Sequence, residues 1–207
     1  MAAPAVSTVI FDMDGVLCTY DLRVRLDRLA AIAGSTREAV HAAIWTSGFE
    51  DQADAGGYAD ADRYLAAFAA RLGAALTREE WIAARAAAMT PRPGMLSFAR
   101  SLQPARTIAM LTNNGPATEQ AFAALFPEAA ALFGERAFFS WRFGTKKPDP
   151  SIFAQVANRL GVAPADCLFI DDKAHNVTGA MAAGMAGVHF TGETAFRAEL
   201  DRLGIRP

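Results

Sequence analysis

Two aspartates that are separated by a single residue follow an apolar run near the start of the chain. Residues 9–18 read VIFDMDGVLC, so Asp12 and Asp14 come directly after an apolar tripeptide. A short β-branched and aromatic run bounded by glycine is typical of a buried strand. Residues two apart on a strand point to the same side, so both carboxylates should lie together at the strand's carboxyl end. Close, buried carboxylates repel each other, so we expect a cation beside them.

Polar residues also follow three further apolar runs that have the character of strands. They are Thr112, Asn113 and Asn114 after residues 106–111, Lys146 and Lys147 after 136–140, and Asp171 and Asp172 after 166–170. Each group alone is common in turns, helix caps or solvated faces. In an open parallel sheet, however, ligands bind beyond the carboxyl ends of the strands, so together these groups predict one site.

The use of lysine supports the same site. The chain has 17 arginines but only three lysines, and all three lysines lie next to these predicted strand ends. Lysine carries a compact point charge that arginine does not reproduce. The pattern therefore indicates that a small ammonium group is needed there.

The side chains at these strand ends could carry out phosphoryl transfer with Mg²⁺. The four carboxylates can hold a hard divalent cation, and Mg²⁺ prefers a few carboxylates, waters and a substrate phosphate. One aspartate of the first pair could attack phosphorus, while the other exchanges protons with the leaving oxygen and with water. The hydroxyl of Thr112 could bind phosphoryl oxygens, and Lys147 could neutralise charge on the reacting groups.

Strands and helices alternate along most of the chain. The predicted strands are residues 6–12, 106–111, 136–140, 166–170 and 186–190, and the predicted helices are 94–102, 116–125, 149–160, 174–183 and 193–204. This alternation predicts an α/β fold with a parallel sheet that is covered on both faces by helices.

The segment from 19 to 91 breaks this alternation. It contains no predicted strand, and its predicted helices are 21–33, 36–47, 60–73 and 77–89, two of them introduced by the capping boxes Ser35/Glu38 and Thr77/Glu80. The segment is too long for a βα crossover. We therefore expect a core of residues 1–18 and 92–207, an inserted all-α domain of residues 19–91, and hinges near 15–19 and 90–94.

Four motifs resemble those of the haloacid dehalogenase (HAD) superfamily, in the same order. They are FDMDGVL, LTNN, KKPDPSIF and FIDDKAHNVTGA. With a helical insertion after the first motif, the chain resembles the subfamily that carries a small α-helical cap of the C1 type. The resemblance implies a three-layer Rossmann-like core with an all-α cap, and a Mg²⁺-dependent phosphatase that works through an aspartyl-phosphate.

The resemblance also implies a role for each motif residue. Asp12 would be the nucleophile, and Asp14 the general acid/base whose backbone carbonyl also contacts Mg²⁺. Thr112, Asn113, Lys147 and Gly15 would bind the substrate, and Thr112 and Lys147 would also take part in catalysis. The metal would be held by Asp12, Asp14, Asp172 and Asp171, the last directly or through water. Asn176 would orient the loop that carries the last two aspartates, and Lys146 would be peripheral.

The inserted domain should determine which phosphate ester is accepted. The stretch GFEDQADAGGYADADRYLAAF resembles cap regions of sugar-phosphate phosphatases and of epoxide-hydrolase N-terminal phosphatase domains. A sugar phosphate is therefore one expected substrate. Candidate substrate contacts are Trp45, Phe49, Glu50, Asp51 and Tyr58. For Trp45 and Phe49, packing inside the cap is the favoured interpretation.

Other functions remain open at this stage. A phosphomutase uses the same core, and a 2-haloacid dehalogenase uses the same nucleophile, although Asp14 favours phosphoryl transfer over dehalogenation. Phosphonate cleavage through a Schiff base needs a cap lysine, and residues 19–91 contain none. A phospho-receiver domain would carry its paired aspartates near the start and would lack the insertion. A non-catalytic binding protein would not need the intact set of residues.

Composition restricts the partners and the location. The net charge is −2 and the pI about 5.9, so the balance of charge does not favour nucleic acid. No apolar run is long enough to predict a membrane span, and the start of the chain does not resemble a signal peptide. Cys18 and Cys167 lie in apolar segments and are predicted to be buried thiols. We expect a cytoplasmic protein, monomeric or homodimeric, that acts on a small phosphorylated molecule.

Overall fold

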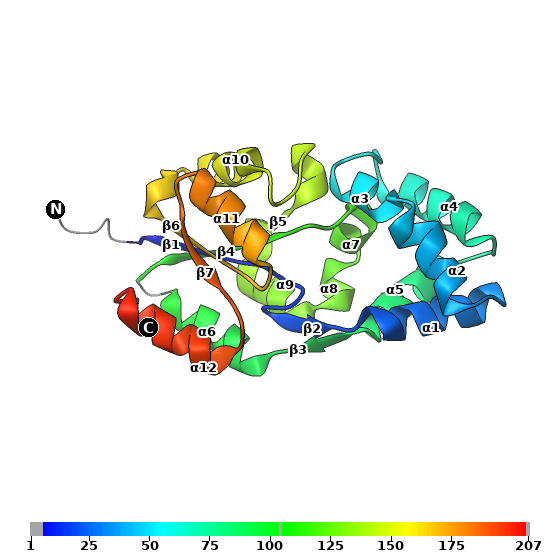
Figure 1. Ribbon diagram of the computed structural model, residues 1–207, viewed down its shortest axis with the longest axis horizontal. Helices are drawn as coiled ribbons and strands as arrows, with labels where there is room; N and C mark the ends of the chain where they lie inside the picture. Colours follow the sequence, from blue (N-terminus) through cyan, green and yellow to red (C-terminus); the bar gives the residue numbers. More distant parts are fainter. Residues whose placement is uncertain (1–5, 104, 206–207) are drawn as a thin grey trace.

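A five-stranded parallel sheet forms the centre of the computed structural model, which describes residues 6–103 and 105–205 (Figure 1). The strands are, in spatial order, β5 (Ala137–Phe139), β4 (Thr107–Thr112), β1 (Thr8–Phe11), β6 (Cys167–Asp171) and β7 (Ala186–His189). Val9 pairs with Ile108 on one side and with Leu168 on the other. The strand that leads into Asp12 therefore lies in the middle of the sheet.

Helices cover both faces of this sheet, as predicted. One face is covered by α6 (Pro93–Leu102), α8 (Phe122–Leu125), α9 (Pro127–Phe133) and α12 (Glu193–Arg202), and the other by α10 (Pro150–Leu160) and α11 (Ala174–Ala182). Val9 and Phe11 of β1 pack in the first layer and Ile10 packs in the second, because side chains alternate along a strand. The three-layer α/β prediction is confirmed.

The segment between β1 and α6 is mainly helical. It contains α1 (Leu22–Ala33), α2 (Arg37–His41), a π-helix (Ala42–Thr46), α3 (Phe49–Asp54), α4 (Ala61–Leu72) and α5 (Arg78–Ala86). These helices pack around their own apolar cluster, which includes Tyr64, Phe68 and Trp81 and extends to Ala117 and Leu125 of the core. We propose residues 19–91 as the cap and use that name below.

The prediction that residues 19–91 hold no strand is wrong. Two short strands, β2 (Cys18–Tyr20) and β3 (Met89–Pro91), pair antiparallel where the chain leaves and re-enters the core. Each has three residues, and Thr19 pairs with Thr90 although the whole cap separates them in sequence. Neither segment has an alternating pattern of strand length, so each depends on the other to form.

Some predicted helices also begin or break at other residues. The N-cap residue of α2 is Thr36 and not the predicted Ser35, and the Thr36 side chain accepts a hydrogen bond from the amide of Ala39. The Thr77/Glu80 capping box is confirmed. The predicted helix 36–47 changes into a π-helix after α2. Helices α3 and α9 lie where the sequence predicted no helix. The predicted helix 116–125 is divided into α7 (Pro116–Gln120) and α8. Short 3₁₀ turns lie at Gly134–Arg136, Ser140–Phe143 and Pro164–Asp166.

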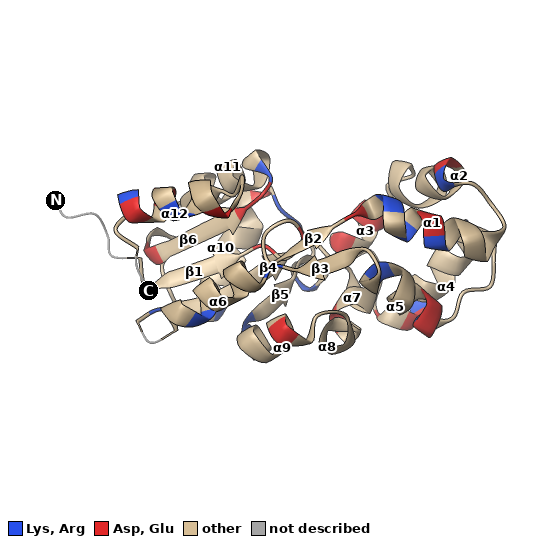
Figure 2. Cartoon of the chain, turned by 90° about the horizontal axis from the view of Figure 1, so that it is seen from below, with Lys and Arg blue, Asp and Glu red and all other residues tan. Residues whose placement is uncertain are grey.

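Charges of both signs are mixed over the cap. Figure 2 shows blue and red segments side by side on α1, α2 and α5.

Within the described residues, none of the helices has the length and apolar character that crossing a membrane requires. Cys18 and Cys167 are both buried and unbonded to each other, as predicted.

Candidate active site

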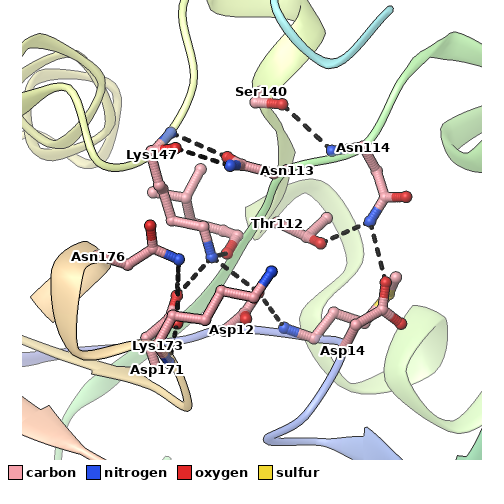
Figure 3. A network of polar contacts seen from close by, with 12 residues as sticks. Asp12, Asp14, Thr112, Asn113, Asn114, Ser140, Lys147, Asp171, Lys173 and Asn176 are labelled. Atoms are coloured by element: carbon pink, nitrogen blue, oxygen red, sulfur yellow. Dashed lines mark hydrogen bonds and ion pairs between the residues drawn. The ribbon is translucent and has the colours of Figure 1, made fainter. Parts of the chain in front are cut away.

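The carboxyl ends of neighbouring strands bring the motif residues together (Figure 3). Asp12 directly follows β1, Thr112 ends β4 and Asp171 ends β6, and β1 pairs with both of the other strands. Lys147 enters the same place from the loop that precedes α10. All four side chains are at most 5% exposed. Adjacent parallel strands thus place residues that are far apart in sequence around one buried point.

Lys147 is fixed at both its backbone and its side chain. Its Nζ lies 2.8 Å from Oδ1 of Asp12 and 2.7 Å from Oδ2 of Asp171, and it donates to the carbonyl of Leu111 at 3.1 Å. The side-chain amide of Asn113 donates to the carbonyl of Lys147 at 2.8 Å and accepts from its amide at 2.9 Å. Asn113 therefore positions the lysine loop, and its contact with substrate stays a prediction.

Asp171 is fully buried and makes several hydrogen bonds. Besides Lys147, it accepts from Nδ2 of Asn176 at 3.0 Å on each oxygen and from the amide of Lys173 at 2.8 Å. These contacts fix both Lys147 and the start of α11. The part predicted for Asn176, orientation of this loop, agrees with its contacts.

The two aspartates of the first motif lie in different electrostatic environments. Burial raises the pKa of Asp12 well above the usual carboxyl range, and the nearby Asp171 adds to the rise, although Lys147 opposes it. Burial alone would also raise the pKa of Asp14, but the guanidinium of Arg85 outweighs this and lowers the pKa. A cation held beside Asp12 would oppose the rise in the pKa of Asp12, because a nearby positive charge favours the ionised form of a carboxyl group.

Three carboxylates fit a divalent cation. Asp12, Asp171 and Asp172 each offer an oxygen, and these oxygens all lie within 4.8 Å of one another. Oδ1 of Asp172 is buried and, among the described residues, has no hydrogen-bond partner. A buried carboxylate oxygen without a partner is costly, and a cation at this point would satisfy it. An all-oxygen donor set of this kind suits Mg²⁺.

An open pocket reaches the edge of this cluster. It has a volume of about 530 Å³ and is lined by Gly15, Asp172, Arg92 and His189, among other residues. Gly15 approaches Asp172 so closely that it leaves no room for a side chain. Its predicted contact with substrate stays a prediction, and its visible role is to make space for Asp172.

Asp14 points away from the three carboxylates. Its Oδ2 accepts from Nη2 of Arg85 at 2.8 Å and from Nδ2 of Asn114 at 3.4 Å, and its Oδ1 lies 3.5 Å from the thiol of Cys18. Its carboxylate is thus outside the acidic cluster. Metal binding through its backbone carbonyl stays a prediction.

Thr112 is linked to Asp14 through Asn114. Oγ1 of Thr112 accepts from Nδ2 of Asn114 at 2.7 Å, which leaves its own hydroxyl hydrogen available to a ligand. The amide of Asn114 donates to Oγ of Ser140 at 3.2 Å. The sequence placed Asn114 at a strand end without assigning it a role, and the structure shows that it bridges two predicted site residues.

Arg85 is the site residue that the sequence analysis missed. It comes from α5 of the cap and is only 3% exposed. It follows Trp81 by four residues, which puts it on the buried face of α5. A charged residue on the apolar face of a helix was the available signal.

The cap candidates mostly pack within the cap. Phe49 is 1% exposed and packs against Tyr58, which confirms the packing interpretation for Phe49, and Trp45 is partly buried against the same cluster. Glu50 accepts from the hydroxyl of Tyr64 at 3.0 Å. Asp51 pairs with Lys146, which lies outside the buried cluster, as predicted.

Comparison with known proteins identifies relatives of this chain. A family model described as haloacid dehalogenase-like hydrolase matches residues 6–184. "Flavin mononucleotide hydrolase 1" of Arabidopsis thaliana is 42% identical over 74 residues, which are 33% of this chain and only 30% of that protein. "Phosphatase MT3486" of Mycobacterium tuberculosis is 28% identical over 87% of this chain and 85% of its own length.

A solved structure has the same fold. It is a HAD family enzyme from Bacteroides thetaiotaomicron in complex with magnesium and inorganic phosphate. The two chains are 19% identical, and the match covers 91% of this chain and 96% of the solved one. The TM-score is 0.78. The predicted superfamily is confirmed by these matches.

Proposed function

This chain belongs to the haloacid dehalogenase-like hydrolases, and from that premise we propose that it is a Mg²⁺-dependent phosphatase that hydrolyses a small phosphate monoester through a phosphorylated Asp12. The observation that carries the proposal is the arrangement around Asp12. Its carboxylate lies 2.8 Å from a buried lysine and next to Asp172, whose Oδ1 has no protein partner among the described residues. Two similar proteins are named as a phosphatase and a flavin mononucleotide hydrolase, which supports the reaction class.

In the first step, an oxygen of Asp12 attacks phosphorus and the bond from phosphorus to the ester oxygen breaks. Lys147 neutralises negative charge that develops on the phosphoryl group, and the hydroxyl of Thr112 donates to a phosphoryl oxygen. Asp14 must carry a proton when the substrate binds, and it gives that proton to the leaving alcohol oxygen. The products of this step are the free alcohol and an aspartyl-phosphate on Asp12.

In the second step, Asp14 accepts a proton from water, and the water oxygen attacks phosphorus. The bond between phosphorus and Asp12 breaks, which releases inorganic phosphate and restores the carboxylate. Asp12, Asp172 and Asp171 would hold Mg²⁺. The bound ion would reduce the repulsion between the Asp12 carboxylate and a phosphate dianion.

Asp14 is the residue that separates this reaction from dehalogenation. A halide leaves without a proton, so a dehalogenase has no use for an acid two residues after the nucleophile. Here Asp14 is held by two protein donors, Arg85 and Asn114, and Asn114 links it to Thr112. The presence of a carboxyl group at this position favours an ester substrate whose alcohol must be protonated.

The direct test is phosphate release from a panel of phosphate monoesters that includes sugar phosphates and flavin mononucleotide. We expect turnover with Mg²⁺, none with EDTA, and a loss of at least about a thousandfold in Asp12→Asn, because the nucleophile is removed. Asp27→Asn, at an exposed position of α1, is the matched control and should keep full activity. Turnover that persists in EDTA or in Asp12→Asn would contradict the proposal.

A further inference from the structure

Arg85 is a buried cation that reaches from the cap to a core carboxylate. Its Nη2 donates to Oδ2 of Asp14 at 2.8 Å, and its Cζ lies 5.0 Å from the centroid of the Tyr20 ring. Its Nε is buried and has no partner among the described residues. A guanidinium is removed from water at high cost unless it is paired, so the contact with Asp14 is the main interaction that compensates this burial.

The two oxygens of Asp14 have different surroundings. Oδ2 accepts from both Arg85, on the cap, and Asn114, on the core. Among the residues that the structure describes, Oδ1 has only the contact with the Cys18 thiol at 3.5 Å, and a thiol is a weak donor. Oδ1 is therefore the oxygen that remains available for proton exchange with a ligand.

Asn114 alone does not fix this carboxylate. Its contact with Asp14 is 3.4 Å long, and the same Nδ2 donates to Thr112 at 2.7 Å. The short, charge-assisted contact comes from Arg85. The direction of the carboxylate thus depends on a residue of the cap, and it depends on where the cap lies relative to the core.

We propose that Arg85 is a positioning residue: from the cap, it holds Oδ2 of Asp14 so that Oδ1 faces the leaving oxygen of the substrate. The inference rests on the proposed phosphatase function, in which Asp14 serves that oxygen. Its consequence is that Asp14 is aligned for catalysis only while the cap lies against the core.

The test compares two esters whose leaving groups need different amounts of protonation. The p-nitrophenolate ion leaves without help, whereas an alkoxide such as that from glycerol phosphate needs a proton. The quantity to compare is kcat/KM, because it reports the steps up to release of the alcohol and excludes hydrolysis of the aspartyl-phosphate. We expect Arg85→Met to lower kcat/KM by about tenfold to a hundredfold for the alkyl ester and by less than about threefold for p-nitrophenyl phosphate.

Two controls separate positioning from general damage to the cap. Arg78→Met removes an arginine of the same helix that contacts Gln120 of the core instead of Asp14. This variant should lower kcat/KM equally for both esters or leave it unchanged for both. In an Asp14→Asn background, Arg85→Met should cause no further loss of kcat/KM for the alkyl ester, because the residue through which it acts is already lost. An equal loss for both esters in Arg85→Met, or an added loss in the double variant, would overturn the proposal.

A crystal structure of Arg85→Met gives a readout that does not need activity. We expect the Asp14 carboxylate to leave its present direction or to occupy several, and an unchanged carboxylate would overturn the proposal. If the wild-type protein hydrolyses neither ester, the phosphatase function fails, and the crystal structure then decides separately whether Arg85 positions Asp14.

Discussion

A Cβ atom on Gly15 would lie 2.4 Å from Cγ of Asp172. The loop that follows β1 and the loop that follows β6 therefore touch at a point where only hydrogen fits. Gly15 also has a φ of +101°, a backbone conformation that other residues rarely adopt. The glycine of the first motif thus determines where a proposed metal ligand of the last motif can lie.

Replacing Gly15 with alanine should weaken metal binding. The added methyl group must displace Asp172, and changes next to metal ligands typically lower metal affinity by about 10–100-fold. Backbone strain should also lower the free energy of unfolding by about 1–3 kcal/mol. Activity as a function of Mg²⁺ concentration and unfolding in urea measure the two effects.

Gly34→Ala is the matched control for Gly15→Ala. Gly34 also has a positive φ, +57°, but nothing lies within 4 Å of the Cβ that would be added. We expect this variant to lose stability and to keep its dependence on Mg²⁺. If both variants need the same Mg²⁺ concentration as the wild-type protein, the close approach to Asp172 does not matter for metal binding.

Replacing Lys147 with methionine should abolish activity and destabilise the fold. Asp12 and Asp171 would face each other without their shared cation, and breaking a buried ion pair in this way costs about 3–5 kcal/mol. Urea unfolding at neutral pH measures the loss. Added Mg²⁺ should recover part of it, because the ion supplies positive charge beside Asp12.

Lys146→Met is the control for that variant, since the two lysines are adjacent. Lys146 pairs with Asp51, which is 72% exposed, and a surface pair of this kind contributes at most about 1 kcal/mol. A similar loss of stability in both variants would show that burial between two carboxylates is not what makes Lys147 important.

The sequence predicted three core residues of the site because each of them lies at the end of a strand. Asp12, Thr112 and Asp171 lie at the ends of apolar runs, and the rule that parallel strands present their carboxyl ends at one edge brings them together. The same reasoning gave the order of the layers. These inferences need only local sequence and a general rule of topology.

Contacts between the cap and the core could not be predicted in this way. Arg85 and Asp14 are 71 residues apart, and the contact depends on how α5 is oriented relative to β1. The pairing of Thr19 with Thr90 depends on the same long-range arrangement. No local pattern reports the orientation of an inserted domain, which is why both were missed.

Asp54 should make the protein less stable as the pH rises. Burial raises the pKa of Asp54 to about 8, and the nearby Glu50 adds to the rise, while Lys146 and Arg85 oppose it. In the unfolded chain an aspartate loses its proton near its ordinary pKa of 3.8, whereas Asp54 in the folded protein keeps its proton up to a pH of about 8. Between these values the folded state binds more protons, so the free energy of unfolding falls as pH increases.

Asp54→Asn tests this titration, because the amide has the same shape and does not ionise. Urea unfolding between about pH 4 and pH 8 should give a shallower decline in stability for the variant than for the wild-type protein. The same slope in both proteins would mean that Asp54 does not keep its proton in the folded state.

The cap should move on the paired strands β2 and β3, which carry the chain across both predicted hinges. In the present arrangement, the polar contacts between cap and core include Arg85 on Asp14 and the carbonyl of Asp54, which accepts from Oγ of Ser140 at 2.6 Å. Asp12 is buried in this arrangement, so we expect an open form before substrate binds. Small-angle scattering should show a smaller radius of gyration with Mg²⁺ and orthovanadate than without them. Arg85→Met should shift the ligand-free protein further toward the open form, because it removes the buried contact. An identical radius with and without ligand would contradict cap movement.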